Sequence, residues 1–105
     1  MKRLMKKFIL LFTLFVSTLS FAQSTGSIVG KLIDKEYNDE PLAFANVLIK
    51  GTTKGTTSDI DGGYSFNNLD PGSYILQFSF VGYETQEINI EVKDGQDVEL
   101  NVPMA

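Results

Sequence analysis

Apolar and polar residues alternate with a period of two along most of the chain after residue 22, which is the pattern of β-strands with one buried face. The longest such segment covers residues 73–83, where Tyr74, Leu76, Phe78 and Phe80 fall on one face. We expect a long, largely buried strand here, with its bulky face as the floor of the core. Nothing in the segment is chemically reactive, which favours a binding or structural module over an enzyme.

Six further segments follow, separated by Gly, Pro and Asp residues, and all of them alternate in the same way except the threonine-rich one within 51–58. They predict strands at residues 28–33, 44–50, within 51–58, 64–69, 86–93 and 98–102. The strand within 51–58 is bracketed by glycines and is the expected edge of a sheet. Asp94 and Gly95 predict a hairpin between the last two strands, and Pro103 should end the final strand. About seven short strands without helical periodicity predict an all-β, antiparallel β-sandwich.

The same alternation assigns side chains to the core. The inward positions are Ala45, Val47, Ile49, Tyr64, Phe66, Ile88, Ile90, Val92, Val98, Leu100 and Val102. Most aromatic residues lie at core phase, so packing explains them better than ligand binding. Tyr37 and Tyr83 lie in turns instead and are the two aromatics expected to make surface contacts.

The first 22 residues predict a secretory signal peptide. Four basic residues precede an apolar run over residues 8–21, and Ser20 and Ala22 are small residues at the third and first positions before a cut. Cleavage would start the mature chain at Gln23 and leave residues 23–105 as one domain. An uncleaved membrane anchor is the alternative, although the run is short for a span of ~20 residues.

Removal of this leader would leave five lysines against thirteen acidic residues, a formal charge of −8. Such a surface repels phosphate backbones, so we expect no nucleic-acid partner. The chain has no cysteine and no histidine, which removes disulfides, imidazole metal sites and histidine-based triads. No cofactor is expected.

Acidic residues provide two weak chemical candidates. Asp59 and Asp61 precede a glycine and could contribute oxygen ligands to a hard cation, but a complete calcium loop needs further ligands at other offsets. We expect both side chains to accept backbone N–H bonds within a turn instead. A catalytic carboxylate pair is the other candidate, yet Glu87, Glu91 and Glu99 occupy outward strand positions where solvated charge is the norm.

Binding is the better prediction, and two groups of residues could carry it. Tyr37 and Tyr83 could stack on a sugar or a peptide. Thr56 and Thr57 lie in the expected edge strand, whose unpaired backbone groups could receive a partner strand. The alternative for the second group is a polar edge that prevents aggregation.

Five stretches together resemble the carboxypeptidase-regulatory-like domain. They cover nearly the whole chain after the leader and lie at residues 28–34 (IVGKLID), 40–42 (EPL), 45–52 (ANVLIKGT), 55–64 (GTTSDIDGGY) and 78–83 (FSFVGY). The resemblance implies a transthyretin-like β-sandwich of about seven strands that is exported and non-catalytic.

The family is often found at the N-terminus of TonB-dependent outer-membrane receptors of Gram-negative bacteria, including receptors for glycan uptake. The resemblance therefore implies a periplasmic accessory domain whose partners are proteins of the outer-membrane uptake apparatus. Membrane association would come only through a receptor barrel, so transport is expected to reside outside these 105 residues. The chain would then be part of a receptor or a free-standing secreted domain, and a carbohydrate- or peptide-binding module is the alternative function.

Overall fold

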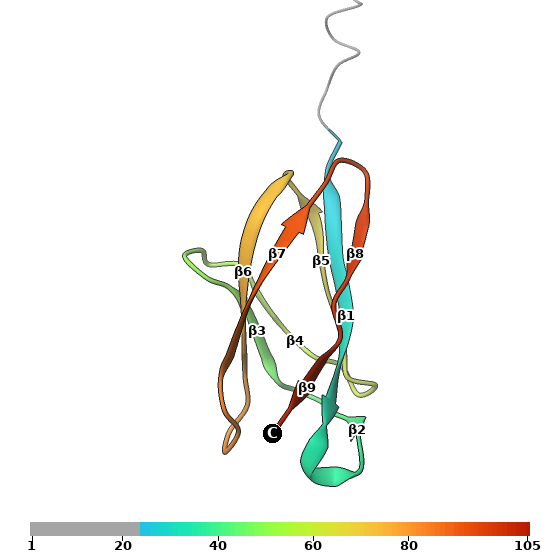
Figure 1. Cartoon of the computed structure of the whole chain (residues 1–105), viewed down its shortest axis with the longest axis vertical. Helices are drawn as coiled ribbons and strands as arrows, with labels where there is room; N and C mark the ends of the chain where they lie inside the picture. Colours follow the sequence, from blue (N-terminus) through green and yellow to red (C-terminus); the bar gives the residue numbers. More distant parts are fainter. Residues whose placement is uncertain (1–23) are drawn as a thin grey trace, which may run out of the picture.

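The computed structural model describes residues 24–105, and the predicted signal peptide lies outside the described residues. Two β-sheets face one another (Figure 1). The strands are β1 (Gly26–Asp34), β2 (Glu40–Pro41), β3 (Asn46–Ile49), β4 (Gly55–Thr57), β5 (Gly63–Leu69), β6 (Gly72–Ser79), β7 (Gln86–Val92), β8 (Asp97–Glu99) and β9 (Val102–Met104). A single 3-10 turn, η1 (Lys35–Tyr37), follows β1. The prediction of an all-β sandwich is confirmed.

The first sheet is organised around β1. This strand pairs antiparallel with β5 and β2, and parallel with β8 and β9. The second sheet has the order β4-β3-β6-β7, and all of its pairs are antiparallel. β4 therefore forms an edge of the second sheet, as its position between glycines predicts.

The inner faces of both sheets supply a continuous core. Its fully buried side chains include Ile28 and Leu32 of β1, Val47 and Ile49 of β3, Leu76 and Phe78 of β6, and Val102 and Met104 of β9. The rings of Tyr64 and Phe78 meet edge to face across the two sheets, with centroids 5.5 Å apart. The predicted alternation in β3, β5 and β6 is thus confirmed, although β6 ends at Ser79 and Phe80 begins the following turn.

The prediction for the last two strands is wrong. Asp94 and Gly95 form a turn, but the chain crosses there from β7 in one sheet to β8 in the other, so no hairpin forms. The predicted strand over 98–102 is split into β8 and β9, each parallel to β1. Pro103 lies within β9, opposite Ile33, because an edge strand tolerates a residue without a backbone N–H.

The predicted start of a strand at about Phe44 is the second correction, because β3 begins at Asn46. The Phe44 side chain is 71% exposed, and its backbone φ is +62°, which breaks the strand alternation before β3 begins. Across residues 24–105 there is no helix with the length and apolar character needed to span a membrane.

Candidate functional site

The four predicted binding residues lie in two separate places. Tyr37 and Tyr83 line a shallow hollow of about 400 Å³ together with Glu36, Gly82 and Ala105. Thr56 and Thr57 line a different groove on the flank of the sandwich. The structure therefore brings together the members of each pair but not the two pairs.

The hollow at Tyr37 is built by a tight local fold. Asp34 caps η1 by accepting the backbone N–H of Glu36 at 3.0 Å. Asn38 and Asp39 then adopt left-handed backbone conformations, which Asn and Asp tolerate better than most residues. Tyr37 projects from this turn and is 66% exposed.

The side chain of Tyr83 is fixed by contacts with Asp34 and Phe80, whereas that of Tyr37 projects into solvent. The Tyr83 hydroxyl donates a hydrogen bond of 2.7 Å to Oδ1 of the buried Asp34, and the Tyr83 ring lies 5.4 Å from that of Phe80. This hydrogen bond, followed by burial and the negative charge of Asp34, raises the pKa of Tyr83 to about 12. Tyr83 is therefore a neutral hydrogen-bond donor at physiological pH that joins the turn at residues 80–85 to the end of β1.

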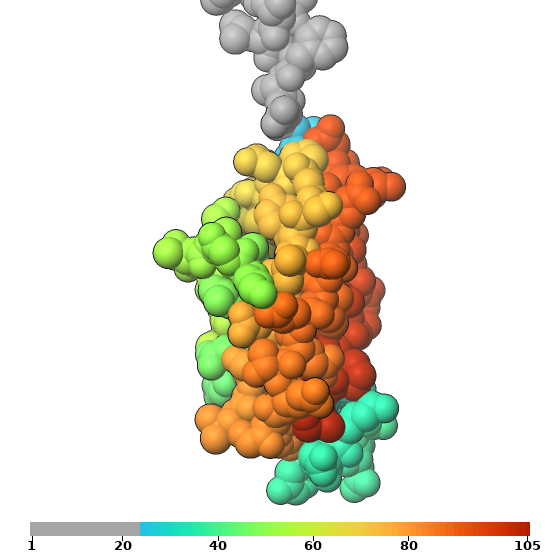
Figure 2. Space-filling model, turned by 60° about the vertical axis from the view of Figure 1, so that its left-hand side comes forward, coloured from blue at the N-terminus to red at the C-terminus, as the bar shows by residue number. Residues whose placement is uncertain are grey.

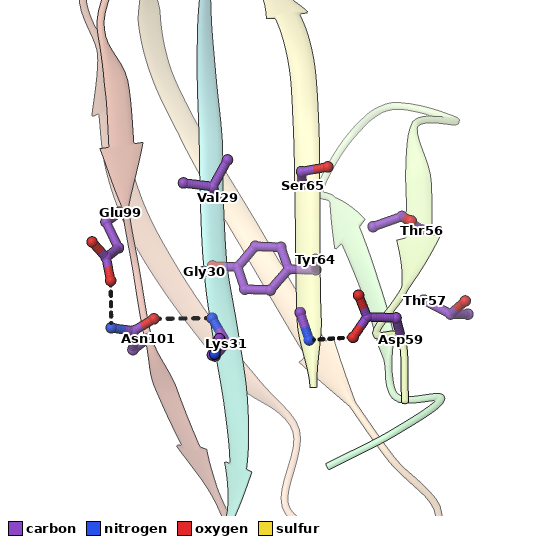
Figure 3. A pocket seen from close by; sticks show the side chains of 11 residues that line it. Val29, Gly30, Lys31, Thr56, Thr57, Asp59, Tyr64, Ser65, Glu99 and Asn101 are labelled. Carbon is purple, nitrogen blue, oxygen red and sulfur yellow. Dashed lines mark hydrogen bonds between the residues drawn. The ribbon is translucent and has the colours of Figure 1, made fainter. Parts of the chain in front are cut away.

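The flank groove has a volume of about 470 Å³ and lies between the edge strand β4 and strands β5 and β1 (Figure 3). Polar side chains line most of it. They are Lys31, Thr56, Thr57, Asp59, Ser65, Glu99 and Asn101. Asn101 links two of its neighbours, since it accepts the backbone N–H of Lys31 at 2.9 Å and donates to Glu99 at 3.0 Å. Hydroxyl, amide, ammonium and carboxylate groups thus face one open groove that suits a polar ligand.

Sequence reasoning missed Tyr64 and Gly30 as part of this groove. Tyr64 was expected only as a core residue, and its ring is indeed buried, yet its hydroxyl donates to the Leu100 carbonyl oxygen at 2.6 Å. Burial raises the pKa of Tyr64 to about 12. Gly30 lies directly opposite Tyr64 in the sheet, and a glycine within a strand is the one sequence signal for such a close approach.

Asp59 serves its own turn. Its Oδ1 accepts the backbone N–H of Asp61 at 2.9 Å and that of Gly63 at 2.8 Å, as predicted for a turn aspartate. Asp61 is exposed, and it takes part in this turn through its backbone N–H, which donates to Asp59, and not through its carboxylate. Within residues 24–105 no three acidic residues are grouped so that they could hold a metal ion.

Comparison with known proteins identifies relatives of this fold and sequence. TonB-dependent receptor P39 from Formosa agariphila is 39% identical over 97 residues, which are 90% of this chain and 9% of that receptor. TonB-dependent receptor SusC from Bacteroides thetaiotaomicron is 36% identical over 91 residues, 81% of this chain and 9% of that receptor. The chain therefore spans about a tenth of the length of these relatives.

A solved structure supports the architecture alone. GBS52, the minor pilin of Streptococcus agalactiae, superimposes with a TM-score of 0.63 at 16% identity, covering 78% of this chain and 44% of the pilin. Residues 28–105 also match the family model described as the CarboxypepD_reg-like domain. The resemblance found in the sequence motifs is thus confirmed, and the chain belongs to the CarboxypepD_reg-like domain family.

Proposed function

We propose that this chain is an exported, non-enzymatic accessory domain that binds protein partners, as a segment of a TonB-dependent receptor or in association with one. The observation that supports this most directly is the 39% identity to TonB-dependent receptor P39 over 90% of the chain. Its location would be the periplasm, at the periplasmic face of the outer membrane of a Gram-negative bacterium. Its partners would be proteins of the uptake apparatus.

Binding rather than catalysis is supported by the roles of the carboxylates. Asp34 is buried and receives two hydrogen bonds that hold a turn and a loop together. Asp59 closes its own turn, and Glu87 of β7 forms an ion pair at 2.9 Å with Lys50, which follows β3, across the intervening strand β6. Each of these groups has a structural partner, and they lie on different elements of the fold.

The test of this proposal combines the gene with the protein. The DNA downstream of the codon for Ala105 should continue into a plug and a β-barrel, and the affinity-tagged protein should co-purify with outer-membrane uptake components after cross-linking in cells. An unrelated exported β-sandwich with the same tag is the control. A downstream region without plug or barrel, combined with no captured uptake component, would end the proposal.

A second candidate function is a secreted carbohydrate- or peptide-binding module. The flank groove in Figure 3 favours it, because Thr56, Thr57 and Ser65 place three hydroxyl groups along one polar surface. Titration of glycan and peptide panels, followed by tyrosine fluorescence, tests this function. Thr56→Val and Thr57→Val should weaken any ligand found there, whereas uniformly flat titrations would remove the candidate.

A further inference from the structure

The most exposed apolar side chains of the described chain lie at one end of the sandwich. This end, termed the loop end, is formed by residues 35–45, 58–62 and 80–85. Its large exposed side chains are Tyr37 at 66%, Phe44 at 71%, Ile60 at 77% and Val81 at 93% exposure. The loops of the opposite end, at residues 70–71 and 93–96, have no exposed large hydrophobic residue.

Figures 1 and 2 show how the loop end is assembled. β1 runs toward it, and β3, β5 and β7 all start from it. In Figure 2 the segment after β1 and the turn before β7 lie at the same lower extremity of the molecule. The apolar side chains therefore share one end although they come from three loops that are distant in the sequence.

Phe44 is presented on a constrained backbone. A φ of +62° is strained for a bulky residue, so the surrounding structure must maintain it. Two hydrogen bonds to Ser58 hold this backbone conformation. The Phe44 N–H donates to the Ser58 carbonyl oxygen at 2.9 Å, and the Ala45 N–H donates to Ser58 Oγ at 2.9 Å. The fold thus directs a phenyl ring largely into solvent, where most of its surface is not packed against this chain.

The two ends also differ in charge. The loop end carries six acidic residues and one lysine, a formal charge of −5. The loops of the opposite end carry one lysine and two aspartates, a formal charge of −1. A surface that is both apolar and negative is complementary to a cationic partner with apolar side chains.

We propose that the loop end is a docking surface for a basic protein segment that carries apolar side chains. This inference rests on the proposed function and deepens it, because it names the surface and the chemistry of the partner. Leucine-like side chains of the partner cover Tyr37, Phe44, Ile60 and Val81, while its lysines or arginines pair with the surrounding carboxylates. Burial of each exposed side chain provides affinity, and the charges set orientation and association rate.

Two other occupants fit less well. An anionic lipid surface is repelled by the −5 charge of the loop end. A second copy of this chain would have to offer its opposite end, which has a formal charge of −1 and no large exposed apolar side chain. A basic protein segment satisfies both the charge and the apolar surface.

The experiment uses the purified protein and a fluorescein-labelled peptide in which lysine and leucine alternate. Fluorescence anisotropy in low salt should show saturable binding that weakens as salt is added. Peptides in which glutamate replaces lysine, or serine replaces leucine, should bind at least about tenfold more weakly, since they lack one half of the complementarity.

Two variants of the loop end test the surface directly, and each should weaken peptide binding at least about tenfold. The apolar variant combines Tyr37→Ser, Phe44→Asn, Ile60→Thr and Val81→Thr. The charge variant combines Glu36→Gln, Asp39→Asn and Glu40→Gln. All of these side chains are exposed, so the thermal midpoint measured by circular dichroism should stay close to that of the wild type.

Two control variants remove carboxylates or apolar side chains from surfaces outside the loop end. The charge control combines Asp70→Asn, Glu91→Gln and Asp94→Asn, and the apolar control combines Leu48→Thr and Ile75→Thr, which lie on a sheet face. Both controls should bind the peptide as the wild type does.

Two results with the peptide would overturn the inference: the wild type shows no saturable binding, or the controls and the loop-end variants lose binding equally. Two results with other partners would also overturn it: phosphatidylglycerol vesicles bind the loop end better than the peptide does, or light scattering shows that this end mediates self-association.

Failure of this inference is separable from failure of the proposed function. If the apolar and charge variants still co-purify with uptake components, the domain is an accessory module that uses another surface. If the peptide binds the loop end but no uptake component is captured, the docking surface is real and the receptor association is wrong.

Discussion

The Tyr64 hydroxyl donates a hydrogen bond to the Leu100 carbonyl oxygen across the backbone of Gly30. The oxygen atoms are 2.6 Å apart, and the bond joins β5 to the segment between β8 and β9. β1 separates these elements in the sheet, so the tyrosine must pass over it. A glycine on β1 provides that passage, because a Cβ at position 30 would lie 1.8 Å from the Leu100 oxygen.

Gly30→Ala should destabilise the protein strongly. The added methyl group would also lie 2.9 Å from the Tyr64 hydroxyl oxygen, so both the tyrosine and the Leu100 backbone would have to move. Overpacking of this kind costs about 1–3 kcal/mol, and the lost hydrogen bond adds about 1 kcal/mol. Urea unfolding followed by circular dichroism measures the change in the free energy of unfolding.

Gly55→Ala is the matched control for that substitution. Gly55 lies in the edge strand β4. A Cβ there would lie 3.4 Å from Val47 O, which is ordinary contact, and the backbone φ of Gly55 is one that residues with a side chain adopt readily. Its free energy of unfolding should stay within about 0.5 kcal/mol of the wild type. Equal stability losses at the two positions would show that Gly30 has no special role.

The protein should lose stability as the pH rises from about 10 to about 12. Tyr64 and Tyr83 each have a folded-state pKa of about 12, and an unfolded tyrosine ionises near 10. Above pH 10 the unfolded chain therefore releases these protons first, which favours unfolding; below pH 10 the contribution is fully retained. Thermal midpoints measured across this range should fall steadily.

Tyr64→Phe and Tyr83→Phe separate the two contributions. Absorbance at the tyrosinate band should show late-titrating tyrosines in the wild type, and each substitution should remove one of them. Each variant should also be less stable at pH 7, because Leu100 O or Asp34 Oδ1 loses its tyrosine donor. Tyrosines that all ionise together near pH 10 would contradict both assignments.

Local patterns predicted the second sheet well and the first sheet incompletely. Alternation places Val47, Ile49, Leu76 and Phe78 inside because every pair in that sheet is antiparallel and half-buried. The parallel pairing of β8 and β9 with β1 depends on which sheet the chain enters after Gly95, and the residues of that turn are compatible with a hairpin as well. Long-range packing, and not the residues of the turn, determines which sheet the chain enters next.

The candidate sites show the same division. Tyr37 is found on the surface because it lies in a charged turn, and Thr56 and Thr57 lie at an edge as their glycine flanks predict. The positive φ of Phe44 was not predicted, because Ser58 maintains it from a distant turn. Neither the loop end nor the flank groove is contiguous in sequence, so no single stretch encodes them.

Phe78→Ala should remove a large share of the total stability. Phe78 is fully buried on β6, and its ring meets Tyr64 edge to face between the sheets. Truncation of a buried phenylalanine costs about 3–5 kcal/mol, against a total of about 5–15 kcal/mol for a domain. Val81→Ala, at a side chain that is 93% exposed, is the control and should change stability by less than about 0.5 kcal/mol in the same urea titration.

Ser58→Ala should destabilise the loop end without removing any of its exposed side chains. Ser58 is 1% exposed, and its Oγ accepts the Ala45 N–H at 2.9 Å while donating to the Leu42 carbonyl oxygen at 2.7 Å. Alanine would leave both backbone groups buried and unpaired, at a cost of about 1–3 kcal/mol for each group that finds no water. Urea unfolding measures the total, and hydrogen exchange at the Ala45 amide reports the local bond.

Ser65→Ala removes a hydroxyl from an exposed position on β5 and is the appropriate comparison. We expect Ser58→Ala to speed exchange at Ala45 and to weaken binding of the lysine–leucine peptide, because Phe44 loses the constraint that holds its backbone at a positive φ. Ser65→Ala should do neither. If Ser58→Ala lowers stability but leaves peptide affinity unchanged, the display of Phe44 does not depend on this hydroxyl and the loop end binds through its other apolar side chains.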